Sequence, residues 1–203
     1  MPTADSTRVS LPLTLAVPGA GFRLGRTPVA NAEYAPFVAA GGAPAPRWWL
    51  DPDYSAPDQP VVGVTWFEAC DYAAWLSELT RARWRLPTEA EWERGARGGI
   101  QGAATAWGER LPDGEVPEGP IGGPWPVGRG TANGYGLCDV GTIVHEWCLD
   151  WFDPDQATRR ASRGGSWRHH VRWSSPSARS SLPPDFRYAD YGFRVLQEVP
   201  TQA

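Results

Sequence analysis

Glycine and proline interrupt nearly every part of this chain, and this limits how much regular helix or strand it can form. The 203 residues include 23 glycines and 21 prolines, a content that is typical of disorder when apolar residues are scarce. The same chain carries 12 tryptophans, whereas disordered chains are poor in aromatic residues. A buried indole contributes a large apolar surface to a core. We therefore expect a loop-rich α+β fold with few helices and short antiparallel strands, anchored by aromatic side chains.

The length fits one domain. We expect this domain to cover residues 9–198, with a frayed N-terminus at 1–8 and a short tail at 199–203. No apolar run approaches the about 20 residues that cross a bilayer, and the chain does not begin with the pattern of a secretory signal. Its three cysteines are too few and too irregular for a disulfide framework. These features predict no membrane association and a cytoplasmic location.

Charge is unevenly distributed along the chain. The net charge is −4, which does not indicate a partner among nucleic acids. Residues 159–194 nevertheless contain eight arginines and only two acidic residues. Two interpretations stay open for this segment. The arginines are either solvated and ion-paired, or they line a cleft for an anionic or carboxylate-bearing ligand, which the guanidinium fork suits.

Two helices are well marked. Thr65 is followed three residues later by Glu68, and Thr88 is followed in the same way by Glu91. This spacing is the signature of a capping box at a helix N-terminus. We predict one helix from Thr65 to about residue 80, and a second from Thr88 that ends before the glycine pair at 98–99.

Other elements are signalled more weakly. Asn31 is the expected cap of a short helix that ends near residue 41, although it contains a proline. Short strands are expected at residues 22–24, 165–167 and 192–195. We assign most tryptophans to the core and three of them, in loops, to the surface: Trp48, Trp49 and Trp173.

Several short motifs occur in a fixed order along the chain. The most specific is Arg-Leu-Pro-Thr-Glu-Ala-Glu-Trp-Glu at residues 85–93, and the others lie at 27–34, 60–66, 133–139, 145–147, 163–167, 178–180 and 192–195. In this order they resemble the formylglycine-generating enzyme, or sulfatase-modifying factor, superfamily. The resemblance covers most of the chain from about residue 22 onward. It implies a C-type-lectin-like fold with a degenerate, loop-heavy architecture.

The resemblance also carries an expectation about copper. In the family's enzymes, two cysteines just after the Gly-Gly-Ser motif bind Cu(I), a soft ion that prefers thiolates. The corresponding residues here, 168–176, include no cysteine. Formylglycine formation through copper and cysteine is therefore not expected. Ser166 and His170 match positions that line the family's active site, and they are the catalytic candidates.

Calcium is not expected either. Relatives place an asparagine, a hard oxygen ligand, before the glutamate of the acidic motif. The matching residue here is Ile143, which has no side-chain oxygen, so Glu146 is left alone. We expect Glu146 to accept hydrogen bonds from the backbone of a loop.

Histidine offers a different metal site. His145, His169 and His170 all fall in motifs that the fold would bring to one end of the molecule, and imidazole suits copper, iron and zinc. The last two are adjacent, so in a strand they would point to opposite faces. One metal ion would not easily take both.

Three functions stay open at this point. The first is a binding domain for a peptide or small anionic ligand, held on a shelf at residues 168–184. Its ligand-binding candidates are polar or aromatic: Ser166, Trp167, His169, His170, Arg172, Trp173 and Arg179. The second is a non-haem, metal- and oxygen-dependent oxidoreductase with a histidine site. The third is a variable receptor of the retroelement type, in which residues 168–184 would be the hypervariable stretch.

Overall fold

The computed structural model describes residues 9–113, 116 and 119–200. The N-terminal segment 1–8 and residues 201–203 of the expected tail lie outside these residues. Within the described part, three α-helices and two four-stranded sheets are linked by long irregular segments. This is the loop-rich α+β architecture that the sequence predicts. None of the described helices is long and apolar enough to cross a membrane.

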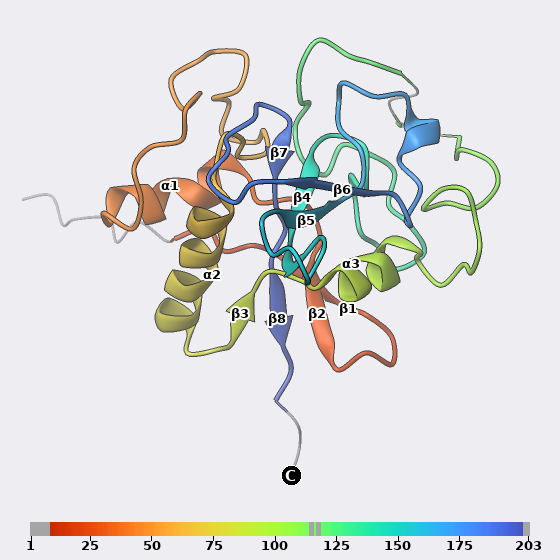
Figure 1. Ribbon diagram of the computed structural model, residues 1–203, viewed down its shortest axis with the longest axis horizontal. Helices are drawn as coiled ribbons and strands as arrows, with labels where there is room; N and C mark the ends of the chain where they lie inside the picture. The colour runs from red at the N-terminus through yellow and green to blue at the C-terminus, as the bar shows by residue number, and fades with distance from the viewer. Residues whose placement is uncertain (1–8, 114–115, 117–118, 201–203) are drawn as a thin grey trace, which may run out of the picture.

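The two sheets lie between the helices (Figure 1). The first sheet is antiparallel throughout, in the order β1 (Thr14–Ala16), β2 (Phe22–Gly25), β8 (Leu196–Glu198) and β3 (Trp84–Arg85). The second has the order β6 (Arg179–Leu182), β5 (Arg160–Arg163), β4 (His145–Trp151) and β7 (Tyr191–Gly192). Its β4 and β7 run parallel, and the other pairs run antiparallel.

The two capping boxes are present. In α2 (Trp66–Thr80), Thr65 Oγ1 accepts from the Glu68 amide at 3.2 Å, and the Glu68 carboxylate accepts from the Thr65 amide at 2.8 Å. In α3 (Glu89–Ala96), Thr88 and Glu91 make the same reciprocal pair. Both helices therefore begin where the sequence predicts, because the capping contacts span only three residues.

The first helix is capped differently from the prediction. In α1 (Asn31–Ala39) the cap is Ala30, and its amide donates to the Glu33 carboxylate at 2.9 Å. Asn31 is inside the helix, and its side-chain amide donates to the carbonyls of Tyr54 and Ala56. The asparagine thus fixes a neighbouring loop, so it does not serve as the cap.

Of the three predicted strands, one is present as expected, one is present only at its first residue, and one is absent. The segment 22–24 is in β2, as expected. Residues 165–167 follow a turn after β5 and belong to no strand. Of residues 192–195, only Gly192 is in a strand. The carbonyls of Phe193 and Val195 accept hydrogen bonds from the amides of Val29 and Gly25.

The core consists of two large clusters of buried side chains. One gathers α1 and α2 around Trp147, Tyr72 and Phe193, and the other packs α3 onto Leu24 through Trp92. Among the tryptophans expected at the surface, Trp173 is 64% exposed. Trp48 and Trp49 are half-buried.

Candidate functional site

The turn after β5 positions the serine of the Gly-Gly-Ser motif. Gly164 has a φ of +76°, a conformation that L side chains rarely adopt, and a Cβ added there would lie 2.7 Å from the Cα of Gly141. Only glycine fits this close approach. The turn places Ser166 in a buried position.

Four side chains meet around this serine, and we call His145, Ser166, His169 and Asp190 the Ser166 cluster. Ser166 Oγ donates to Asp190 Oδ2 at 3.0 Å and lies 3.1 Å from His169 Nδ1. The rings of His145 and His169 have centroids 5.1 Å apart and meet edge to face. His145 also packs on Tyr191, with centroids 4.8 Å apart.

The hydrogen bonds fix the tautomers of both imidazoles. Ser166 gives its single proton to the Asp190 carboxylate, so its oxygen accepts from His169 Nδ1. His145 Nδ1 donates to the carbonyl of Gly164 at 2.9 Å, because a carbonyl only accepts. Burial lowers the pKa of His145 to about 4. His145 is therefore neutral at pH 7, and its Nε2 carries a lone pair.

A groove of about 670 Å³ lies beside the cluster. Its lining combines cationic and aromatic side chains from three separate segments: Arg47, Trp48, Arg168, Asp185, Phe186, Arg187, Tyr188 and Ala189. Arg168 joins the groove to the cluster, since its guanidinium lies 3.7 Å from the Asp190 carboxylate. Trp167 Nε1 donates to the carbonyl of Ala189, a residue of the groove lining.

The three arginines of the groove differ in how they are paired. Arg187 makes a bidentate ion pair with Glu68, which holds its guanidinium against the N-terminus of α2. Arg168 lies over the ring of Trp167 and is half-exposed. Arg47 lies 5.1 Å over the ring of Trp48, and no described carboxylate pairs with it. A ligand anion would therefore compete with no described carboxylate for Arg47.

The aromatic side chains give the groove an apolar wall. Phe186 and Tyr188 stack with ring centroids 6.3 Å apart, and they are 44% and 43% exposed. Trp48 lies 6.1 Å from Tyr54, which in turn contacts Trp167. Large aromatic surfaces left in contact with solvent beside a cation without a carboxylate partner are typical of a binding site.

The predicted ligand shelf is divided in the structure. Ser166 and His169 belong to the cluster, and Trp167 is hydrogen-bonded to Ala189 of the groove lining. The remaining candidates lie elsewhere. Arg172 and Trp173 form a short, exposed 3₁₀ turn at Val171–Trp173, where they contact each other. His170 caps that turn by accepting from the Arg172 amide.

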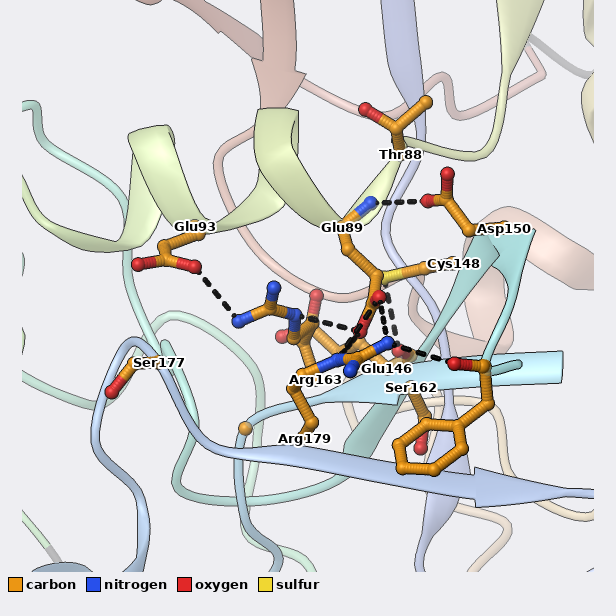
Figure 2. A network of polar contacts seen from close by, with 12 residues as sticks. Thr88, Glu89, Glu93, Glu146, Cys148, Asp150, Ser162, Arg163, Ser177 and Arg179 are labelled. Carbon is orange, nitrogen blue, oxygen red and sulfur yellow. Dashed lines mark hydrogen bonds and ion pairs between the residues drawn. The ribbon is translucent and has the colours of Figure 1, made fainter. Parts of the chain in front are cut away.

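Arg179, the last candidate, is part of an ion-pair network on the opposite side of β5. Figure 2 shows Arg163 and Arg179 directed at the carboxylate of Glu89. Arg163 also bonds to Glu93, and the Glu89 amide donates to Asp150. For these two arginines the ion-paired interpretation of the basic segment is correct. They fix α3 against the second sheet.

The sequence did not single out Arg47, the loop at 185–189 or Asp190. A signal existed for part of this set, because Arg187 and Asp190 belong to the basic segment. Arg47 adjoins Trp48, which was expected at the surface. Their proximity to Ser166 follows from the tertiary fold alone.

Comparison with known proteins identifies the family. Residues 11–199 match the Sulfatase-modifying factor enzyme 1-like domain. This chain belongs to that family. It is 33% identical to the formylglycine-generating enzyme of Thermomonospora curvata, over 85% of this chain and 68% of that protein. It is 30% identical to the enzyme of Streptomyces coelicolor, over 88% and 78%.

Solved structures of the same shape support the fold. PvdO from Pseudomonas aeruginosa superposes with a TM-score of 0.72 and 24% identity, covering 92% of this chain and 90% of PvdO. The Major Tropism Determinant I1 variant gives 0.56 and 14% identity, over 93% and 54%. At these identities the likeness shows the fold alone, which is the C-type-lectin-like fold of the sulfatase-modifying factor type.

The thiols of this family member do not fit a copper centre made of paired thiolates. Cys70, Cys138 and Cys148 are free, and none follows the Gly-Gly-Ser turn. Burial raises the pKa of Cys70 to about 12, and it raises the pKa of the other two thiols as well. Because the thiolate is the form that binds metal, these cysteines are poor ligands where they lie.

The carboxylate of Glu146, the remaining candidate for a calcium ligand, already has other partners in the protein. Its Oε2 accepts from Trp92 Nε1 at 2.7 Å, and its two oxygens pair with Arg194. The expected backbone partners were therefore wrong, because a buried arginine and an indole occupy the carboxylate. Ile143 is fully buried in an apolar cluster. This donor set does not fit calcium, which takes six to eight oxygens.

The three histidines do not form one centre. His145 and His169 lie together, whereas His170 is exposed and caps the next turn. Across the described ranges, no group of three or more His, Cys, Asp or Glu side chains is arranged to hold a metal ion. His169 and His170 lie outside any strand, so the strand geometry considered for them does not apply.

Proposed function

We propose that this chain is a binding domain for a peptide or small ligand that carries a carboxylate beside an apolar or aromatic group. The observation that carries the proposal is Arg47, which lies in an aromatic-walled groove without a carboxylate partner among the described residues. Arg168 supplies a second half-exposed guanidinium. Guanidinium groups bind carboxylates through paired hydrogen bonds.

The test uses a library of N-acetylated tripeptides, each as a free carboxylate and as the matching amide. We expect a subset of carboxylates to bind at least tenfold more tightly than their amides. Arg47→Gln should remove most of that preference, because a hydrogen bond to a charged group contributes about 1.5–3 kcal/mol. Arg110→Gln is the control, since it removes the same charge from an exposed residue that does not line the groove.

Two results would contradict the proposal. One is equal binding of carboxylates and amides. The other is an Arg47→Gln variant that binds as tightly as Arg110→Gln.

The proposal includes the statement that formylglycine is not made by the copper and cysteine route. Support comes from the cysteine-free turn at 168–176 and from the buried, protonated thiols. Incubation with Cu(I) and a Cys-x-Pro-x-Arg peptide should leave the peptide cysteine unchanged, as followed by mass spectrometry. Conversion of that cysteine to an aldehyde would refute this part.

A further inference from the structure

The two imidazoles of the Ser166 cluster are held as metal-binding histidines usually are. A histidine ligand nearly always donates its second ring N–H to a carbonyl, a carboxylate or a similar oxygen, which orients the ring. His145 Nδ1 donates to the Gly164 carbonyl, and His169 Nδ1 donates to Ser166 Oγ. Neither Nε2 has a hydrogen-bond partner among the described residues. Each ring therefore presents a free lone pair.

The spacing of the rings also suits a shared ion. With a metal–nitrogen distance of about 2.0–2.1 Å, two imidazoles on one ion have centroids roughly 4.5–5.2 Å apart, for angles between a right angle and the tetrahedral value. The centroids of His145 and His169 are 5.1 Å apart, with ring planes at 65°. The observed separation of 5.1 Å falls within this range.

The surroundings favour a cation and allow it to enter. Asp190 is linked to His169 through the hydroxyl group of Ser166, and it brings a negative charge to the cluster. Arg168 offsets part of that charge from 3.7 Å. His169 is exposed, whereas His145 is buried against Tyr191. An ion would thus meet an exposed donor, His169, beside a buried one, His145.

We propose that His145 and His169 bind one divalent transition-metal ion of the Cu²⁺ or Zn²⁺ class through their Nε2 atoms. Imidazole suits these ions. No third protein ligand is placed to complete the site in the described part of the chain. The remaining coordination positions are open to water or to a molecule in the adjoining groove. This site stands apart from the carboxylate binding proposed above, and each is testable without the other.

The experiment titrates the untagged, metal-free protein with CuCl₂ or ZnCl₂ by calorimetry, in a glycine buffer that competes for weakly held copper. We expect one site per chain that binds Cu²⁺ more tightly than Zn²⁺, in the usual order for nitrogen ligands. The electron paramagnetic resonance spectrum of the copper form should show coupling to two histidine nitrogens. His169→Ala should weaken binding at least tenfold.

The chain supplies its own matched control, because His170 is exposed, adjacent and turned to another partner. His170→Ala should leave the affinity within twofold of the original. His145→Asn keeps an N–H near the Gly164 carbonyl but removes Nε2, and it should lose binding while staying folded by near-ultraviolet circular dichroism. Ser166→Ala should cost about 10–100-fold through the loss of orientation of His169.

Three results would overturn the proposal. The first is no calorimetric binding of either ion at millimolar concentration. The second is a loss in His170→Ala as large as that in His169→Ala, which would assign the metal to the adjacent exposed rings. The third is undiminished binding in a folded His145→Asn variant.

Discussion

At the scale of single residues, the ion pair between Glu146 and Arg194 has the greatest consequence for stability. The two side chains are 0% and 1% exposed, and Arg194 also donates to the carbonyls of Gly25 and Cys138. A buried charge without its partner keeps the cost of desolvation and loses the attraction that offset it. Through Arg194, the glutamate of the acidic motif therefore links β4 to Gly25 at the end of β2.

We predict that Glu146→Gln lowers the free energy of unfolding by about 3–5 kcal/mol, because Arg194 is left buried and uncompensated. Urea denaturation measures the change. The control is Arg83→Gln, which breaks a pair whose arginine side chain is 84% exposed, and it should cost less than about 1 kcal/mol. A loss in Glu146→Gln no larger than in the control would show that the backbone carbonyls alone satisfy Arg194.

At the scale of elements, the turn after β5 depends on a glycine for two reasons. We predict that Gly164→Ala destabilises the protein more than Gly21→Ala does, by urea denaturation. Both positions have positive φ, +76° and +69°, which costs a non-glycine residue about 1–2 kcal/mol. Only the added Cβ at 164 meets backbone, 2.7 Å from Gly141. Equal losses in the two variants would mean that the turn shifts freely.

The cap of α3 gives a prediction about pH. Burial acts to raise the pKa of Glu91, but hydrogen bonds from Arg85 and Thr88 outweigh it and hold the pKa below its ordinary 4.5. A carboxyl with a lowered folded pKa stabilises the fold above its unfolded pKa, and this contribution is lost as the pH falls through the folded pKa.

Glu91→Gln should therefore show a smaller loss of unfolding free energy between pH 5 and pH 3 than the unchanged protein. Glu78→Gln, an exposed substitution on α2, should keep the original pH dependence. The readout is the urea midpoint at each pH. If Glu91→Gln follows the original curve, the capping pair does not contribute to acid sensitivity.

At the scale of the whole molecule, the folded chain covers the thiols. Cys148 and Cys138 are buried, and Cys70 lies against the larger cluster. We predict that a thiol reagent such as dithionitrobenzoate labels less than one cysteine per folded chain at pH 7.5 within minutes. In guanidinium chloride all three should react. Fast labelling of two native thiols would contradict the burial argument against a thiolate copper centre.

Local contacts explain what the sequence predicted correctly. The caps of α2 and α3 join residues three apart, so spacing alone identifies them. The misassigned cap at Asn31 and the misassigned strand at 165–167 depend on distant partners, namely the loop at 54–56 and Gly141. The order of the motifs was enough to identify the family, because each motif is a short contiguous run of residues that can be read without knowledge of distant contacts.

The sequence by itself determined the family, the loop-rich α+β class, two helices and the lack of cysteines after the Gly-Gly-Ser turn. Only the tertiary structure decided the site. The groove joins Arg47 to Arg168 and to residues 185–189, and the cluster joins His145 to His169 and Asp190. Irregular segments have no period that sets the direction of a side chain, so their neighbours are fixed by packing and hydrogen bonds between segments that are separated in the chain.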